Sequence, residues 1–289
     1  GEVASCPPPM ASRALIRSWP RVARAARLMG PSPRCAAGEA QEMAQGVMYN
    51  WRVAAVNNAL AARGKAEGPL TLEDLTSLGH LDQYHYLGTE ACNELIEALG
   101  LGPGARVLDI GSGIGGPARY LAAKTGCDVT GVELQPDLVE AAASLTERAG
   151  LADRVRFQAG DFETVCGTGK FAGQFEHLIS LLVFCHFPER NKALKHCYES
   201  LKPGGTFIIE DLVQVGPKFS AEEVKNLREV VCTPGVSSVP EYIAALEQAG
   251  FVDVEVDDLT GPWKAWTKAR HEAFRSSKEE TVKLHGEAL

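Results

Sequence analysis

The sequence predicts an α/β fold in which a doubly wound, mostly parallel sheet follows an N-terminal helical segment. Two observations carry this prediction. From about residue 105 onward, short apolar runs alternate with amphipathic helical segments, a pattern typical of parallel strands joined by right-handed crossovers. Between residues 48 and 100 the apolar spacing is helical instead. The chain has 289 residues, 45% of them hydrophobic, which is enough to bury a core of this size.

The individual elements follow from local patterns. Thr71 and Thr89 stand where helices would need an N-cap residue, and Gly64 ends the first apolar helical stretch. The N-terminal helices are therefore expected at 48–63, 69–78 and 89–100. Strands are expected at 105–110, 127–134, 154–160, 177–184, 206–212 and 252–259. Helices between them are expected at 116–126, 136–150, 188–201 and 239–251, and a charged amphipathic helix is expected after residue 260.

The N-terminal segment has a different composition. Residues 3–38 contain six arginines, no lysine and no acidic residue. If the segment were helical, five arginines would share one face: Arg13, Arg17, Arg21, Arg24 and Arg27. This composition is typical of an organelle transit peptide, and a disordered basic leader is the alternative. We expect residues 1–40 to lie outside the fold and to direct the chain to an organelle, a mitochondrion before a plastid; otherwise the chain would be cytoplasmic.

The bulk composition excludes several classes of protein. A net charge of −8 and a pI near 5.5 argue against a nucleic-acid or membrane-surface partner, whose binding face would be basic. No apolar run approaches the 18 residues of a membrane span. The eight cysteines are scattered, without the spacing of a zinc site. We therefore expect no metal and reduced thiols.

A glycine-rich loop, GSGIGG at 111–116, follows the first predicted strand. Gly111, Gly113 and Gly116 fit the dinucleotide pattern G-x-G-x-x-G, which on its own is a weak signal. Asp109 ends the strand, close to where a pyrophosphate would lie, and its carboxylate would repel a phosphate by several kcal/mol at an effective dielectric of ~20. An ammonium-bearing ligand without phosphate would be attracted instead. S-adenosylmethionine is such a ligand.

Two later strands end on further acids. Glu133 ends the second strand, where its carboxylate can accept both hydroxyls of a ribose. Asp161 and Phe162 follow the third, where the acid can accept from an adenine amino group and the ring can cover the base. Each acid alone would usually be a solvated turn residue. Three carboxylates at successive strand ends predict one binding crevice.

These motifs resemble those of the class I S-adenosylmethionine-dependent methyltransferases. VLDIGSGIGGPARYLA is similar to their first motif, and VTGVEL, AGDFE, LLVFCHF and LKPGGTFIIED resemble later ones in order. The resemblance covers about residues 80–215 and implies a Rossmann-like methyltransferase fold. It implies these cofactor contacts: Asp109, Gly111, Gly113 and Gly115 to the methionine part, Glu133 to the ribose, Asp161 and Phe162 to the adenine, and Leu181 along the pocket wall.

The residues that hold the methyl acceptor should come from outside the cofactor sheet. The stretch LDQYHYLGTEA offers Tyr84, His85 and Tyr86, which would close over a sulfonium or, alternatively, only pack the helical cap onto the sheet. His186, after the fourth strand, would take a proton from the acceptor or serve a structural role. Phosphoethanolamine methyltransferases carry a similar motif with an acid four residues before the histidine, where this chain has Leu182.

The C-terminal part resembles the acceptor lobe of sarcosine/dimethylglycine-type methyltransferases. We therefore expect N-methylation of a small amine such as sarcosine or dimethylglycine. A glycine-derived acceptor would need cations for its carboxylate, and Lys218, Lys225 and Arg228 are candidates, each of which is more commonly a solvated surface charge. The alternatives are C- or O-methylation of a quinone or tocopherol ring, a non-catalytic S-adenosylmethionine-binding subunit and, more distantly, an NAD oxidoreductase.

The expected domain organisation follows. Residues 41–103 form the N-terminal cap, and residues 104–289 form the methyltransferase domain with its C-terminal acceptor-lobe helices. Sheets of the family usually finish with an antiparallel strand beside the fifth, and no stretch beyond residue 260 alternates like a strand. The sequence thus predicts either a sheet that is one strand short or a truncated chain. It does not indicate an oligomeric state.

Overall fold

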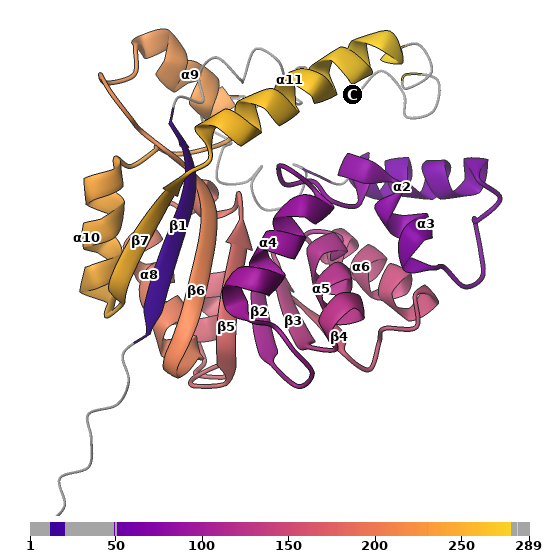
Figure 1. Ribbon diagram of the computed structural model, residues 1–289, viewed down its shortest axis with the longest axis horizontal. Coiled ribbons are helices and arrows are strands. Elements are labelled where there is room, and N and C mark those ends of the chain that lie inside the picture. The colour runs from indigo at the N-terminus through magenta and orange to yellow at the C-terminus, as the bar shows by residue number, and fades with distance from the viewer. Residues whose placement is uncertain (1–11, 21–48, 50, 230, 279–281, 283–289) are drawn as a thin grey trace, which may run out of the picture.

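The expected doubly wound sheet is confirmed in the computed structural model, which describes residues 12–20, 49, 51–229, 231–278 and 282. Seven strands pair in the order β4-β3-β2-β5-β6-β1-β7, and every pair is parallel (Figure 1). The strands are β1 (Arg13–Pro20), β2 (Arg106–Ile110), β3 (Asp128–Glu133), β4 (Val155–Ala159), β5 (Phe175–Leu181), β6 (Leu201–Val213) and β7 (Val252–Asp258). Their carboxyl ends share one edge of the sheet, which is the edge where such folds bind ligands.

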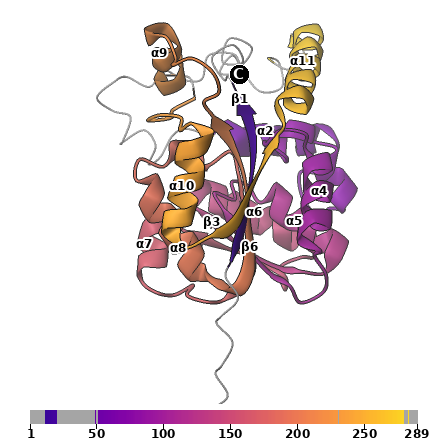
Figure 2. The same ribbon diagram turned by 60° about the vertical axis from the view of Figure 1, so that its left-hand side comes forward.

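Helices cover both faces of the sheet (Figure 2). The described helices are α2 (Trp51–Ala62), α3 (Leu72–Thr76), α4 (Thr89–Leu99), α5 (Gly116–Thr125), α6 (Pro136–Arg148), α7 (Phe162–Gly167), α8 (Arg190–Ser200), α9 (Ala221–Glu229), α10 (Val239–Ala249) and α11 (Thr260–Ser276). Two single-turn 3₁₀ helices are η2 (Gly79–Leu81) and η3 (Phe184–His186). Above the carboxyl edge, α2 and α3 form a cap on one side, and α9 and α11 form an acceptor lobe on the other (Figure 1).

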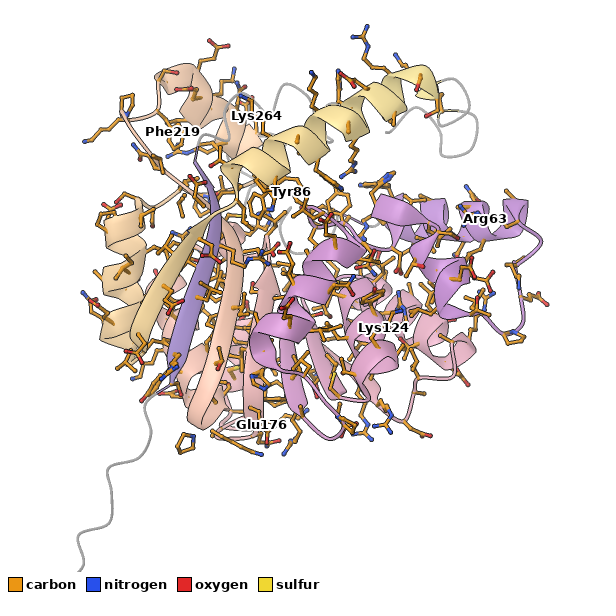
Figure 3. All side chains as sticks on the ribbon, in the orientation of Figure 1. Arg63, Tyr86, Lys124, Glu176, Phe219 and Lys264 are labelled. Atoms are coloured by element: carbon orange, nitrogen blue, oxygen red, sulfur yellow. The ribbon has the colours of Figure 1, made fainter. Side chains whose placement is uncertain are left out.

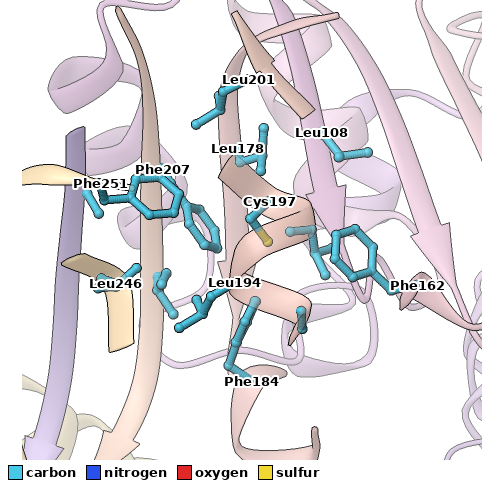
Figure 4. Close-up of a cluster of buried hydrophobic side chains, with 14 of the residues drawn as sticks. Leu108, Phe162, Leu178, Phe184, Leu194, Cys197, Leu201, Phe207, Leu246 and Phe251 are labelled. Atoms are coloured by element: carbon cyan, nitrogen blue, oxygen red, sulfur yellow. The ribbon is translucent and has the colours of Figure 1, made fainter. Parts of the chain in front are cut away.

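The core consists of two main layers, one on each face of the sheet. Val107 and Leu108 are neighbours in β2, and both are fully buried, but they belong to opposite layers, as expected for a central strand. One layer packs α7, α8 and α10 on the sheet and includes Phe184 and Phe207 (Figure 4). The other packs α4 and α5. The central strands are therefore rigid supports for the loops at their carboxyl ends.

The expectation that residues 1–40 lie outside the fold is wrong for the described part of that segment: Arg13–Pro20 forms strand β1 inside the sheet, and it is neither a helix nor a disordered leader. Ala14 and Ile16 are buried on one face of the sheet, so the side chains alternate with a period of two. Pairing with both β6 and β7 satisfies the backbone on both sides, and this outweighs the helical spacing of the arginines. The other residues of the expected leader, 1–11 and 21–40, lie outside the described residues.

An ion pair ties β1 to the sheet. Glu210 of β6 is fully buried, and burial raises its pKa to about 7, although the Arg17 guanidinium opposes the shift. An Arg17 Nη atom lies 3.0 Å from Glu210 Oε1, and the same guanidinium donates to Glu94 of α4. Strand β1 lies between β6 and β7. It occupies, in parallel orientation, the position where sheets of the resembled family usually have an antiparallel strand.

Candidate active site

The glycine loop is bonded to β3 through its backbone, and it packs so closely at two positions that only glycine fits there. The backbone N–H groups of Gly111 and Ser112 both donate to the carbonyl of Val132 in β3, at 2.8 and 3.1 Å. Gly111 has φ +71°, and a Cβ there would stand 2.5 Å from the methyl groups of Val183. A Cβ on Gly115, at φ +78°, would stand 2.3 Å from the ring of Phe157. Any side chain at these two positions would displace the walls of the loop.

Asp109 comes two residues before this loop, and its carboxylate forms no ion pair with a described residue. The residue is 2% exposed, and its Oδ2 atom has no hydrogen-bond partner among the described residues. Burial, and to a lesser extent the Glu133 carboxylate, raises the pKa of Asp109 to about 7. A buried carboxylate without a cation is costly. The arrangement is therefore suited to a ligand that brings a positive charge.

Glu133 is oriented by the backbone of the same loop. One carboxylate oxygen accepts from the Gly113 N–H at 2.9 Å, and the other accepts from the Gln135 N–H at 3.0 Å. Burial raises the pKa of this carboxyl, and the two N–H groups oppose the shift. Each oxygen accepts one such bond, so each retains capacity for another donor, as a vicinal diol would require. The structure thus brings Glu133 next to Asp109, as the sequence predicted.

The third acid has a structural role in the described residues. Asp161 is exposed and caps α7, where its Oδ1 accepts from the Thr164 N–H and hydroxyl at 2.8 and 2.9 Å. Phe162 is 5% exposed and packs edge-on against Phe187 in the core. Leu181 ends β5 and is partly buried against the layer that holds α4 and α5. Contacts of these residues with an adenosine remain predictions.

The segment before α4 divides into packing and partly exposed residues. His85 is 4% exposed, and burial lowers its pKa to about 4, so its neutral ring donates from Nε2 to the Gly88 carbonyl at 2.9 Å. Tyr86 is 5% exposed and packs on Trp263 and Trp266 of α11. Figure 3 shows Tyr86 between α11 and the carboxyl edge of the sheet. These contacts favour the packing alternative for both residues.

Tyr84 is partly exposed, and two guanidinium groups lie over its ring. The Arg52 Cζ atom is 4.5 Å from the ring centroid, and the Arg270 Cζ atom of α11 is 5.7 Å from it. The ring thus connects the cap to the acceptor lobe. Two adjacent cations make this ring a less favourable partner for a sulfonium than the sequence suggested.

Arg52 is a site residue that the sequence analysis missed. It is 5% exposed on α2, and its Nη1 atom lies 3.3 Å from the position that a Cβ on Gly113 would take. The available signal was its position: Arg52 shares the buried helix face of Ala55 and Val56. An arginine on an apolar face is unusual and marks a buried polar environment.

His186 lies at the end of η3, which begins directly after Val183, the residue whose methyl groups face Gly111. Its Nδ1 is 3.2 Å from the Cys232 carbonyl, an acceptor, so the neutral ring carries its hydrogen on Nδ1 and a lone pair on Nε2. Burial lowers the His186 pKa, and the Cys232 bond and Asp211 of β6 oppose the shift. The imidazole is therefore neutral at pH 7 with an unprotonated Nε2, and the Cys232 carbonyl rather than an acid at position 182 fixes its tautomer.

The acceptor lobe contains a cavity of about 290 Å³ beside β6. Lys218 and Arg228 line it together with apolar residues such as Phe219, whereas Lys225 pairs with Glu229 on the surface of α9. The cavity wall is bonded to the backbone next to His186, since the Thr233 hydroxyl donates to the Cys185 carbonyl. Two of the three predicted cations therefore border one cavity.

No group of three or more His, Cys, Asp or Glu residues in the described part of the chain could hold a metal ion. Within the same part of the chain, no helix combines the length and apolar character needed to cross a bilayer.

Comparisons with known proteins find similarity to methyltransferases. Residues 108–209 match a family model described as a methyltransferase domain. The chain is 32% identical over 206 residues to the erythromycin 3''-O-methyltransferase of Saccharopolyspora erythraea, a match that covers 65% of this chain and 66% of the relative.

Two solved structures share the fold. One is a phosphoethanolamine N-methyltransferase 2 of Haemonchus contortus in complex with phosphomonomethylethanolamine and S-adenosylhomocysteine, with a TM-score of 0.61 and 21% identity over 76% of this chain and 55% of that one. The other, from Galdieria sulphuraria, is a proposed sarcosine dimethylglycine methyltransferase, with a TM-score of 0.56 and 20% identity over 68% of this chain and 72% of that one.

Proposed function

This chain contains a class I methyltransferase domain, and from that premise we propose that it transfers a methyl group from S-adenosylmethionine to a nitrogen of a small amine. The observation that carries the proposal is Asp109, a buried carboxylate at the glycine loop whose Oδ2 has no described partner. A cationic donor supplies the missing charge, and a dinucleotide would add a second anion.

The residues present fit the donor. The positive-φ glycines let a ligand approach the loop backbone closely. Glu133 is oriented by two backbone N–H groups, and its remaining lone pairs suit the ribose hydroxyls. Asp109 suits the ammonium. When bound, S-adenosylmethionine would supply a methyl group on a positively charged sulfur, which a nucleophile can displace.

The protein's own part in the reaction is positioning and proton removal. Holding donor and acceptor in line contributes up to about 7–11 kcal/mol of barrier reduction. His186 offers a lone pair on Nε2 and accepts the proton that the acceptor releases. Lys218 and Arg228 line the cavity next to the end of β6, and this supports a role for them in holding an anionic group of the acceptor. A carboxylated amine such as sarcosine or dimethylglycine matches these features, and the likeness to the Galdieria structure supports the same class.

O-methylation is the second candidate. A neutral histidine base also suits a hydroxyl acceptor, and the erythromycin relative is named as an O-methyltransferase. C- or O-methylation of a quinone or tocopherol ring would fall in this group. A non-catalytic S-adenosylmethionine-binding subunit would bind the donor and turn over no acceptor.

Calorimetry and a radiolabelled methyl-transfer assay test the proposal. The wild type should bind S-adenosylmethionine and S-adenosylhomocysteine but not NAD, and it should label sarcosine or dimethylglycine in preference to a quinol or macrolide panel. Binding of NAD alone would refute the donor assignment. Labelling of hydroxyl acceptors only would favour O-methylation, and tight donor binding without labelling would favour the non-catalytic subunit.

We also propose, from the arginine pattern alone, that the N-terminal segment directs the chain to an organelle, a mitochondrion before a plastid. A C-terminal fluorescent fusion tests this in cells. A variant with Arg21, Arg24 and Arg27 changed to glutamine should lose the organelle signal while leaving β1 unaltered. Cytoplasmic fluorescence of the wild-type fusion would contradict the proposal.

A further inference from the structure

Arg52 brings a second charge without an ionic partner among the described residues to the glycine loop. Its guanidinium is anchored by one bond, from an Nη2 atom to the Leu81 carbonyl at 3.0 Å, and by the ring of Tyr84. Its Nε has no hydrogen-bond partner among the described residues. Its Nη1 approaches the Cβ position of Gly113 to 3.3 Å. The cap therefore aims a buried cation at the loop.

The neighbouring acids have hydrogen-bond partners other than Arg52. Asp82 accepts from Arg119 at 2.6 Å and from the Gln83 amide at 2.8 Å, and Glu133 accepts from two backbone N–H groups. Among the described residues Arg52 forms no ion pair. Burial lowers its pKa, and the charges of Asp82 and Glu133 only partly oppose this shift. A guanidinium in this position needs an anion.

One ligand group would satisfy both residues at once. An α-amino acid carries an ammonium and a carboxylate on the same carbon. The buried Asp109 carboxylate comes two residues before the glycine loop, and the buried Arg52 guanidinium approaches the loop at Gly113. We propose that Arg52 binds the carboxylate of the donor's methionyl group while Asp109 binds its ammonium. This inference rests on the proposed function and adds that the cap, through α2, recognises the amino-acid end of the donor.

Two contacts of Arg119 set the position of the cap relative to the glycine loop. Asp82 and Arg119 form a buried ion pair that fixes the segment before Tyr84 against the start of α5, and Arg119 also donates to the Ile114 carbonyl of the loop at 2.6 Å. The cap is thereby held in register with the glycine loop. Arg52 needs that register, because a guanidinium binds a carboxylate well only in a defined planar geometry.

Three nucleosides separate the contributions of the two residues. S-adenosylhomocysteine carries both charged groups, its decarboxylated analogue carries only the ammonium, and 5'-methylthioadenosine carries neither. For Arg52→Gln we expect affinity for S-adenosylhomocysteine to fall by about 10- to 100-fold, as for loss of a charged hydrogen bond, with the other two unchanged. For Asp109→Asn, affinity for both charged nucleosides should fall.

Controls keep the test decisive. Arg63→Gln removes an exposed arginine that follows α2 and bonds to Ser77, and it should change none of the three affinities. Arg52→Lys retains the charge without the planar fork and should give an intermediate loss; it replaces the glutamine variant if thermal melting shows that variant to be unfolded. Equal loss of all three nucleosides in the Arg52 variants, or no loss of S-adenosylhomocysteine, would overturn the inference. If the wild type binds none of the three, the proposed function itself fails.

Discussion

Replacing Asp109 with asparagine should stabilise the ligand-free protein while it weakens donor binding. The carboxyl has an ordinary pKa of 3.8, which burial raises to about 7 in the folded protein. Each pKa unit corresponds to 1.36 kcal/mol, so ionisation of Asp109 costs the folded state about 4 kcal/mol at pH 8. An asparagine of the same shape removes that cost.

The sign of the pH dependence follows from the direction of the shift. Below about pH 4 the carboxyl is protonated in both the folded and the unfolded chain, so the asparagine variant gains nothing. Between pH 4 and 7 the wild type loses stability progressively relative to the variant, and above pH 7 the full difference is present. Urea denaturation at pH 5 and pH 8 should show a larger stability gain for the variant at pH 8, accompanied by a rise of several degrees in its unfolding temperature.

The matched control is Asp153→Asn, which changes an exposed acid in the turn before β4, away from the carboxyl edge. It should alter neither stability nor donor affinity. The reasoning would be refuted if Asp109→Asn were less stable than the wild type at pH 8, because Asp109 would then be a structural acid with a favourable partner. Undiminished affinity of this variant for S-adenosylhomocysteine would refute the binding role separately.

Three further predictions concern the surrounding residues. His186→Gln should lower the rate of methyl transfer by about 100-fold or more and leave S-adenosylhomocysteine binding unchanged in calorimetry. Since burial lowers the His186 pKa, the wild-type rate should fall only when the pH drops below about 6.5. An unchanged rate in the variant would exclude His186 as the base. Asp82→Asn should destabilise the protein by about 3–5 kcal/mol in urea titrations, because it leaves Arg119 buried without its carboxylate; a change under 1 kcal/mol would show that the pair is dispensable. Gly115→Ala should abolish donor binding in a folded protein, since the added Cβ would stand 2.3 Å from the Phe157 ring, and retained binding would mean that the ring moves aside.

The central strands and two of the binding acids were predictable because the relevant signals are local. A run such as VLDI is apolar, short and followed by glycines, and parallel strands place their final residues at a common edge. Asp109 and Glu133 therefore lie together without any knowledge of their side-chain contacts. Asp161 follows the same rule, but the helix that it caps was not expected, because the six residues of α7 are too short to show a helical period.

Strand β1 and the roles of Arg52, Tyr84 and the two histidines could not be predicted, because they depend on contacts between segments that are distant in the sequence. Strand β1 was missed because its arginine spacing also fits a helix, and only the open edges of β6 and β7 decide between the two. Arg52 and Tyr84 are 32 positions apart in the sequence, and their contact depends on how the cap lies on the sheet. The sequence gives no reason to distinguish His85 from His186 as a base. In the structure His85 is bonded through Nε2, whereas His186 is bonded through Nδ1.

The insertion of β1 between β6 and β7 has a consequence for how the chain is made. Strand β1 is made well before both of its partners, as the pairing of Ile16 with Ile209 and Val256 illustrates. Strands β2 to β5 can assemble before β6 and β7 are made. Until β6 is made, β1 has no neighbour in the sheet, and an unpaired strand is prone to edge-to-edge association.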